Sequence, residues 1–299
     1  MTEQIESDSH TIRITHPDKV MFPGDGITKR DLVDYYRSIS LLMIPHVRER
    51  PLTMERYMDG IDSPGFYQKE APGYFPDWIK RVKFKLKEEG REQTQVLCND
   101  EATLLYITNQ GCITHHIWLS RADMLDYPDK LIYDLDPPGD DFDSVKLVAR
   151  FVKKELEKIG FTPYAMTTGS SGMHVVVPLD RKVDFEGTRE FARSFAESLA
   201  DSHSDLLTTE VRKDKRGDRI FLDYLRNSYG QTGIAPYTVR AKPGAPVATP
   251  VGWGELEDVY TSRQFNINNI FKRIEKKGDP WKDFWKSPGS VGVAIKKLS

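Results

Sequence analysis

The feature that most restricts the fold of this chain is the order of strand and helix signals between residues 130 and 225. An apolar run, 131-LIYDLD-136, opens the segment, and an apolar stripe at helical spacing then continues to Gly160. Two strand signals joined by the turn 169-GSSG-172 follow, and a second helical pattern leads into the strand 219-RIFLDYL-225. This βαββαβ order consists of two split βαβ units, so we expect an α+β, ferredoxin-like core.

We expect Asp143 or Ser144 to cap the first core helix, and we expect the second helix to cover residues 187–200. The middle strands are expected at 164-YAMTT-168 and 173-MHVVVPL-179. In this topology the first and third strands lie side by side at the centre of the sheet, and the fourth flanks the first. Both helices cover one face. The opposite face is therefore left open for a functional site.

The N-terminal part of the chain carries weaker signals. Residues 1–10 are polar and acidic, which predicts a frayed tail. A short strand signal follows, and Thr28, with Asp31 three residues later, predicts the capped start of a helix. Pro45 is expected to help end that helix.

Residues 51–87 are expected to form mainly strands and turns. Within them 82-VKFKLK-87 alternates apolar and basic residues, as in a half-exposed hairpin. A second helix is expected to start at Asn99 or Asp100.

The composition is that of an ordinary soluble globular protein, with 43 basic residues, 45 acidic residues and 38% hydrophobic residues. No apolar run approaches the roughly 18 residues that a membrane span requires, and the start of the chain lacks the pattern of a signal peptide. We therefore expect a cytoplasmic protein with no membrane partner. Cys98 and Cys112 form no metal-binding pattern and are expected to be reduced, buried thiols.

An acidic pair lies on the first core strand, at the start of a segment, 134-DLDPPGDDFD-143, with five acids and no base. Asp134 and Asp136 are two residues apart on a strand, so their side chains leave the same face of the sheet. Two like charges this close are unfavourable unless cations lie between them, and hard oxygen ligands favour Mg²⁺ or Mn²⁺. The alternative is a solvated acidic strand end before a turn.

Two further polar residues are expected near this pair. Asp223 lies in an otherwise apolar strand, where an ionised carboxylate is unfavourable without a partner. The expected topology places its strand beside that of Asp134, so three carboxylates converge on the open face. His174 follows the turn 169–172 and is expected to meet the strand end that carries Asp136. Such a turn followed by a histidine can hold a triphosphate, although the turn is also common in plain hairpins.

Arginines bracket Asp223 in the sequence, namely Arg216, Arg219, Arg226 and Arg240. Some of them are expected to be solvated surface residues. Guanidinium groups are nevertheless the natural partners of phosphate oxygens, so this basic surrounding suits a site that binds a phosphorylated substrate.

A series of motifs runs in order along the chain: 16-HPDKVMFP-23, 28-TKRDLVDYY-36, 50-RPLTMERYMDG-60, 66-FYQKE-70, 131-LIYDLDPP-138, 168-TGSSGMHVV-176, 221-FLDYLRN-227 and 234-IAPYTVR-240. Together they resemble the polymerase domain of bacterial DNA ligase D, which belongs to the archaeo-eukaryotic primase superfamily and works in non-homologous end joining. The resemblance implies a single primase-polymerase domain over the whole chain. Its parts would be an N-terminal module at about 10–125 for DNA contacts, a catalytic module at about 126–245 and a C-terminal extension at about 246–299.

The resemblance also implies roles for individual residues. Asp134, Asp136 and Asp223 would be the catalytic residues and would bind two divalent ions, Mn²⁺ or Mg²⁺. The residues implied in binding the incoming nucleotide are Arg56, His116 in preference to His115, Thr168, Ser171, His174, Arg216 and Arg240. Thr168 stands where the family usually has a serine, and Ser171 where it often has a lysine.

On the DNA side, the resemblance implies that His16, Lys19 and Lys29 bind a downstream 5′-phosphate. Template bases would stack on Phe66 and Tyr67, which is a sequence-tolerant mode of binding. The implied partners are DNA with broken or gapped ends, nucleoside triphosphates, Ku and a separate DNA ligase. The chain is then expected to act as a free-standing polymerase in a prokaryote, associated with the nucleoid during repair.

The implied function is a DNA-directed nucleotidyltransferase that fills gaps and extends ends, with a preference for ribonucleotides. Other functions are compatible with the same residues. The protein could synthesise primers, act as a metal-dependent nuclease or phosphodiesterase, or be a non-catalytic nucleic-acid-binding module built on the RNA-recognition scaffold. The sequence has no zinc-ligand cluster of the kind that replicative primases use. Its two central core strands carry acids and a histidine in place of the aromatic residues typical of RNA-recognition modules.

Overall fold

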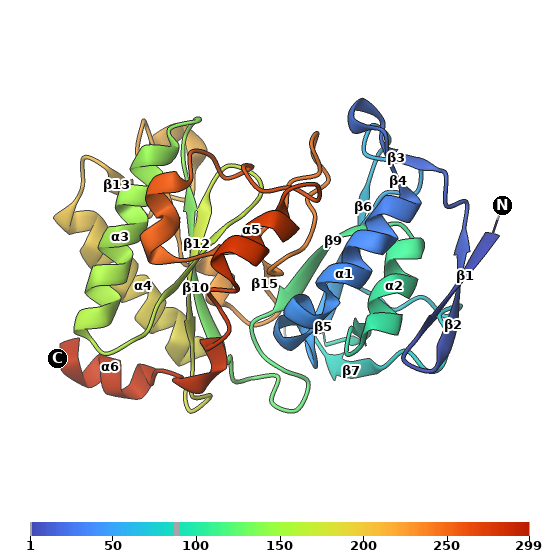
Figure 1. Cartoon of the computed structure of the whole chain (residues 1–299). Coiled ribbons are helices and arrows are strands. Elements are labelled where there is room, and N and C mark those ends of the chain that lie inside the picture. Colours follow the sequence, from blue (N-terminus) through green and yellow to red (C-terminus); the bar gives the residue numbers. More distant parts are fainter. Residues whose placement is uncertain (1, 87–89, 299) are drawn as a thin grey trace. The chain divides into compact units, whose positions relative to one another are not determined.

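The computed structural model of the chain describes residues 2–86 and 90–298 (Figure 1). It contains two compact units, the first made of Met1–Trp118, Ile234–Val247 and Asn266–Asn268, and the second of Leu119–Gly233, Ala248–Phe265 and Asn269–Ser299. The chain therefore passes between the units several times. The segment 246–299, expected as a C-terminal extension, contributes residues to both.

The second unit is built on one six-stranded sheet. In spatial order its strands are β13 (Leu207–Thr208), β14 (Ile220–Asp223), β10 (Lys130–Asp136), β12 (Met173–Pro178), β11 (Tyr164–Thr167) and β16 (Thr249–Val251). Neighbouring strands are antiparallel except β13 and β14, which are parallel. The four inner strands follow the predicted ferredoxin-like order, so the predicted fold class is confirmed.

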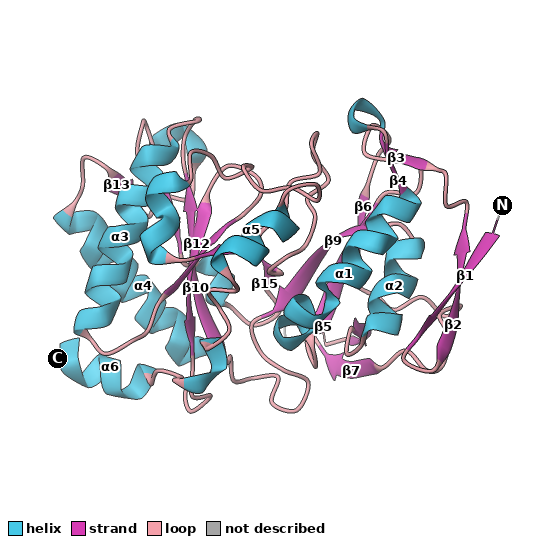
Figure 2. Cartoon of the chain, in the orientation of Figure 1, coloured by secondary structure: helices cyan, strands magenta, loops and turns pink. Residues whose placement is uncertain are grey.

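Helices α3 (Phe142–Lys158) and α4 (Phe185–Ser202) lie together on one side of this sheet (Figure 2). The ring of Tyr133 on β10 packs against Phe195 on α4, with centroids 5.0 Å apart. Because side chains alternate along a strand, Asp134 and Asp136 leave the opposite face. Two short helices, α5 (Ile270–Lys277) and α6 (Val291–Leu298), complete the unit.

The predicted cap of the first core helix was wrong by two or three residues, and the predicted start of the second helix was wrong by two. The N-cap of α3 is Asp141, whose side chain accepts a hydrogen bond from the Ser144 backbone N–H, where Asp143 or Ser144 was expected. The N-cap of α4 is Asp184, which accepts from Gly187 in the same way. In each helix a buried phenylalanine, Phe142 or Phe185, follows the cap directly, and its packing extends the helix toward the N-terminus.

The first unit contains a second sheet. Four of its strands lie in the order β9 (Cys112–Trp118), β5 (Pro51–Arg56), β8 (Glu92–Leu97) and β7 (Arg81–Lys85), and β6 (Phe66–Gln68) also pairs with β5. The expected hairpin at 82–87 is present as the antiparallel pair of β7 and β8, except that Lys87 lies outside the described residues. Strand β15 (Thr232–Ile234) lies where the chain returns to this unit.

Two helices of the first unit, α1 (Lys29–Val47) and α2 (Glu101–Asn109), pack against each other. Thr28 and Asp31 form the predicted capping box of α1, and the expected cap Asp100 begins α2. Pro45 does not end α1 but lies inside it. A proline in the last turn removes only one backbone hydrogen bond, and the buried side chains of Ile44 and Val47 hold that turn in place.

The frayed N-terminal tail was a wrong prediction. Strands β1 (Thr2–Ser7) and β2 (His10–Thr15) form an antiparallel hairpin, and β3 (Val20–Phe22) pairs with β4 (Ile27–Thr28). Ile5 is buried, and the Ser7 hydroxyl donates to a carboxylate oxygen of Glu101 at 2.8 Å. The burial of Ile5 and the hydrogen bond from Ser7 to the distant Glu101 stabilise the strand, although the segment is mostly polar.

Both cysteines are free and buried, as predicted. Over the described ranges 2–86 and 90–298, no helix combines the length and apolar character needed to cross a membrane.

Candidate active site

Three of the predicted site residues meet on adjacent strands. Asp134 lies directly opposite Asp223 on one neighbouring strand, β14, and directly opposite His174 on the other, β12. His174 Nε2 is 3.3 Å from Asp134 Oδ1. Asp136 follows two residues along β10 on the same face. The histidine therefore meets the end of β10 that carries both acids, as expected, and its direct cross-strand partner is Asp134.

Burial makes this cluster electrostatically costly. Asp134, Asp223 and His174 are 6%, 7% and 3% exposed. Burial and the neighbouring charge of Asp134 raise the pKa of Asp136 to about 6. Burial also raises the pKa of Asp223, although its Oδ1 accepts a hydrogen bond from the Leu225 backbone N–H at 2.7 Å. The carboxylates of Asp136 and Asp223 are thus less stable in their charged form than they are in water, so a cation in the cluster would be favourable.

Arg226 supplies part of that positive charge. Its Nε lies 3.6 Å from Asp134 Oδ2 and 3.5 Å from Asp223 Oδ2. The sequence placed Arg226 among the arginines around Asp223 without giving it a role. Its position in the sequence, three residues after Asp223, could have indicated this contact. The short helix η3 (Leu225–Asn227) turns the chain so that the Arg226 side chain lies beside the carboxylates.

The donor set suits a hard divalent cation, because all three acidic side chains offer only oxygen ligands. Within residues 2–86 and 90–298, however, no group of three or more Asp, Glu, His or Cys side chains is arranged as a formed metal site. The structure therefore brings the carboxylates together through strand register, while metal binding by them stays a proposal.

The turn 169–172 presses against the acidic strand. A Cβ added to Gly172 would lie only 1.9 Å from the Leu135 carbonyl oxygen, between the two acids of β10. The Thr168 backbone N–H and hydroxyl both donate to the Gly172 carbonyl, each at 3.1 Å. Ser171 is exposed, and His174 Nδ1 is buried without a hydrogen-bond partner among the described residues. The turn thus has a fixed position beside Asp134 and Asp136.

Arg216 stacks over the ring of Phe221, 3.7 Å from its centroid, and Phe221 is the cross-strand partner of Asp136. The same guanidinium donates from Nε and Nη2 to the carbonyls of Glu210 and Val211, at 2.9 and 2.8 Å. Arg216 therefore lies next to the acidic cluster.

Asn227 is a structural residue of the site that the sequence left without a role. Its side chain is fully buried and clamps β10, since Oδ1 accepts from the Ile132 N–H at 2.9 Å and Nδ2 donates to the Ile132 carbonyl at 2.7 Å. Nδ2 also donates to the Tyr224 carbonyl at 2.8 Å. The amide thus joins the end of β14 to the strand that carries two of the acids.

Replacing Asn227 with Ala should lower the free energy of unfolding by about 2–4 kcal/mol, because two buried backbone groups of Ile132 lose their partner. Urea denaturation measures this loss. Asn268, an exposed asparagine, gives the matched control, and N268A should leave the stability within about 0.5 kcal/mol of the parent protein. A change of that small size for N227A would contradict the clamp.

The candidate residues of the first unit form a separate group. Arg56, which is buried, donates from Nε to the Gln110 carbonyl at 2.8 Å and lies 5.5 Å from the ring centroid of Phe66. His116 Nε2 is 3.3 Å from Glu55 Oε2, and the ring of Tyr67 meets that of His116 edge-on. Phe66 and Tyr67 are 45% and 63% exposed, so both rings are accessible for stacking.

Charge around Glu55 is balanced within this group. Burial alone would raise the pKa of Glu55, but the hydrogen bond from His116 and the charge of Arg240 hold it below its usual value. His115 differs from His116, because complete burial lowers the pKa of His115 to about 3 and keeps the ring neutral. His116 is therefore the more accessible of the two histidines.

His16, Lys19 and Lys29 gather at the N-terminus of α1. The Lys19 backbone N–H donates to the His16 carbonyl at 3.0 Å, and that of Lys29 donates to the Lys19 carbonyl at 2.8 Å. Lys29 is buried, and its Nζ donates to the carbonyls of Thr15 and Asn109. Burial, with the charge of Lys19, lowers the pKa of Lys29. A helix N-terminus with two lysines is a favourable place for an anion.

Comparison with known proteins identifies relatives over nearly the whole chain. The profile of the LigD primase-polymerase domain matches residues 28–281. The bifunctional non-homologous end joining protein LigD of Bacillus subtilis is 32% identical over 279 residues, which is 93% of this chain and 44% of that protein. The multifunctional non-homologous end joining DNA repair protein LigD of Mycobacterium tuberculosis is 32% identical over 278 residues, 90% of this chain and 36% of that protein.

The polymerase domain of Mycobacterium tuberculosis ligase D, solved in complex with DNA, has a similar structure. The TM-score is 0.85 at 29% identity, and the match covers 92% of this chain and 98% of that domain. The chain thus spans less than half of each of these two LigD proteins but nearly all of the solved domain.

Proposed function

Because the chain belongs to the LigD primase-polymerase family, we propose that it is a DNA-directed nucleotidyltransferase that fills gaps and extends ends during the repair of double-strand breaks. The observation that carries the proposal is the open sheet face on which Asp134 is flanked by Asp223 and His174. Buried carboxylates that repel one another are suited to chemistry in which positive ions and phosphates enter together.

In the proposed reaction, the 3′-hydroxyl of the growing strand attacks the α-phosphate of a nucleoside triphosphate, and pyrophosphate leaves. When bound by Asp134, Asp136 and Asp223, two Mn²⁺ or Mg²⁺ ions would lower the pKa of the hydroxyl and screen the leaving oxygens. The protein itself positions the reactants. His174 and the backbone N–H groups of the turn 169–172 would bind the phosphates beside the acids.

We assign the remaining contacts by the family resemblance. Arg56, His116, Thr168, Ser171, Arg216 and Arg240 would contact the nucleotide. Exposed Phe66 and Tyr67 would stack on template bases. DNA with broken or gapped ends is the proposed substrate, by analogy with the DNA-bound relative. The proposal also includes Ku and a DNA ligase as partners, and a preference for ribonucleotides.

Extension of a gapped duplex tests the function. Given a nucleoside triphosphate and Mn²⁺ or Mg²⁺, the protein should lengthen the primer with the templated nucleotide and shorten no strand. It should be more active on a 5′-phosphorylated gap than on an unprimed template. Shortened strands would instead indicate a nuclease, and equal synthesis on the unprimed template would indicate a primase.

The 5′-phosphate site gives a sharper prediction. Lys19 is half-exposed, and its Nζ pairs with Asp59 and donates to the Met58 carbonyl at the surface, whereas Lys29 is buried against the carbonyls of Thr15 and Asn109. Replacing Lys19 with Ala should weaken binding to a 5′-phosphorylated gap by about tenfold, the effect of one charge-assisted contact, and should hardly change binding to the 5′-hydroxyl form. Fluorescence anisotropy measures both affinities.

Lys80 is an exposed lysine of the same unit, and K80A serves as the matched control for total charge. If K19A weakened both forms of the gap equally, or if K80A reproduced its effect, Lys19 would have no role in recognising the 5′-phosphate.

A further inference from the structure

The loop before α5 reaches across the second unit to the turn 169–172. The Ser262 hydroxyl, which is 1% exposed, donates to the Gly172 carbonyl at 2.7 Å and lies 3.2 Å from the Thr168 hydroxyl. Arg263 donates from Nε to the Ser170 carbonyl at 2.8 Å. Two successive side chains of the loop thus bind two carbonyls of the turn, about 90 residues away along the sequence.

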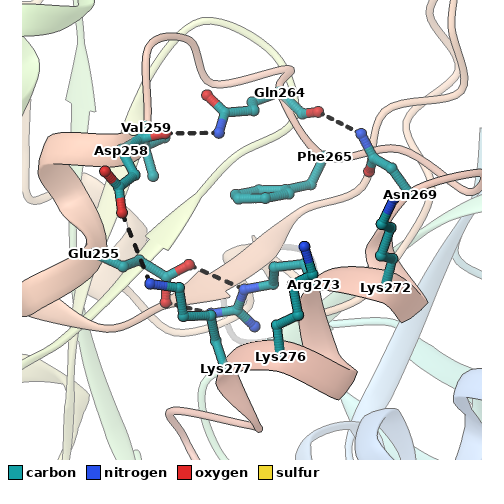
Figure 3. A pocket seen from close by; sticks show the side chains of 10 residues that line it. All are labelled: Glu255, Asp258, Val259, Gln264, Phe265, Asn269, Lys272, Arg273, Lys276 and Lys277. Carbon is teal, nitrogen blue, oxygen red and sulfur yellow. Dashed lines mark hydrogen bonds and ion pairs between the residues drawn. The ribbon is translucent and has the colours of Figure 1, made fainter.

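Hydrogen bonds of its own residues close the loop (Figure 3). Gln264 closes it, since Oε1 accepts from the Tyr260 backbone N–H and Nε2 donates to the Asp258 carbonyl, both at 2.8 Å. Asn269 Nδ2 donates to the Gln264 carbonyl at 2.9 Å and fixes the loop to the start of α5. Ser262 and Arg263 therefore project from a closed loop and not from a loose strand end.

Beneath the loop, α5 is tied to the short helix η4 (Trp253–Asp258) by a buried ion pair, in which Arg273 Nη2 lies 2.6 Å from Glu255 Oε2. Phe265 lies over a cavity of about 290 Å³ between these helices. The Glu255 and Arg273 side chains point toward each other and form part of the cavity lining (Figure 3). This ion pair holds α5 and η4 together, and the loop is fixed to the start of α5.

The turn that the loop holds is in direct contact with the acidic strand. Gly172 abuts the Leu135 carbonyl between Asp134 and Asp136, so a shift of the turn changes its distance from both carboxylates. Without Ser262 and Arg263, the carbonyls of Gly172 and Ser170 would lose these contacts and the turn would have more freedom. A loosened turn would present its N–H groups less precisely.

We propose that Ser262 and Arg263 are positioning residues, which hold the turn 168–172 where it receives the phosphates of the incoming nucleotide. That the turn receives a nucleotide rests on the proposed function. That the loop holds the turn rests on the hydrogen bonds of Ser262 and Arg263. Neither residue needs to touch the substrate. Both act through the carbonyls on the side of the turn that faces the loop.

The test uses the full chain with S262A, R263A and R263K. For S262A and R263A, KM for the nucleoside triphosphate should rise about three- to tenfold, the effect of one lost hydrogen bond, while kcat changes less and the affinity for gapped DNA is unchanged. R263K keeps a donor at the end of a long side chain and should recover part of the loss. K272A removes the charge of an exposed lysine on α5 and should match the parent protein.

Hydrogen exchange of the apo protein provides an independent readout. The amides of residues 168–173 should exchange faster in S262A and R263A, while those of α4 keep their protection. Unchanged KM together with unchanged exchange would overturn the proposal. So would a uniform loss of protection across the second unit, because that indicates general destabilisation. If the parent protein incorporated no nucleotide, the proposed function would fail, and local exchange at the turn would still decide whether the loop positions it.

Discussion

Asp136→Asn is expected to lower the rate of nucleotide incorporation by on the order of a thousandfold, because it removes one of three carboxylates proposed to hold the catalytic ions. The variant keeps the shape of the side chain, so DNA binding should be nearly unchanged. Its resistance to heat, without added metal, should be equal to or above that of the parent protein, since one source of repulsion beside Asp134 and Asp223 is gone. Single-turnover extension, DNA anisotropy and thermal melting measure the three effects.

The chain offers a matched control in Asp140, an exposed acid of the loop after β10. D140N makes the same chemical change four residues away and should retain near-normal incorporation. Appreciable activity in D136N, above about a tenth of the parent rate, would refute the assignment of this carboxylate to catalysis. A large fall in stability would contradict the view that the cluster is costly without a cation.

Gly172→Ala is expected to reduce incorporation by at least about a hundredfold, the scale of loss that a misplaced reacting group can cause. The added Cβ would meet the Leu135 carbonyl oxygen at 1.9 Å. The carbonyl oxygen is a backbone atom, and the backbone fixes the position of a Cβ, so no side-chain rotation can relieve the clash and the turn must move away from the acids. We also expect the free energy of unfolding to fall by about 1–3 kcal/mol, as for other overpacked sites.

Gly139 gives the comparison that isolates the clash. It lies in the loop after the same strand, and an added Cβ there meets nothing within 4 Å. G139A should therefore retain activity and stability. Equal activity of G172A and G139A would show that the close approach of the turn to β10 is unimportant for the reaction.

The order and pairing of the core strands could be predicted from the sequence because each element carries a strong local pattern, and few topologies connect six such elements. The meeting of Asp134 with Asp223 followed from that topology and is confirmed by the register. The exact partner of His174 did not follow. Register depends on the length of the turn between β11 and β12, and the hydrogen bonds of Thr168 inside that turn set it.

Other features depend on contacts that no local pattern reveals. Residues 2–7 have a polar sequence, yet they form a strand because Ser7 and Ile5 pack against distant residues. Asn227 gave no signal of its role as a clamp, since an asparagine after a strand is equally typical of a turn. The link from Ser262 to Gly172 spans 90 residues and could be found only in the folded chain.

The first unit is built from segments that are far apart in the sequence, 1–118, 234–247 and 266–268, and this affects how it can fold during translation. The Tyr36 hydroxyl donates to the Ile113 carbonyl at 2.5 Å, but it also accepts from the Val239 N–H at 2.9 Å, and the Thr238 hydroxyl accepts from the His115 N–H at 2.9 Å. All of these groups are buried. As translation proceeds, residues up to 118 leave the ribosome long before these late partners exist. The first unit therefore cannot complete these buried hydrogen bonds until the whole βαββαβ segment and residues 238–239 have been made.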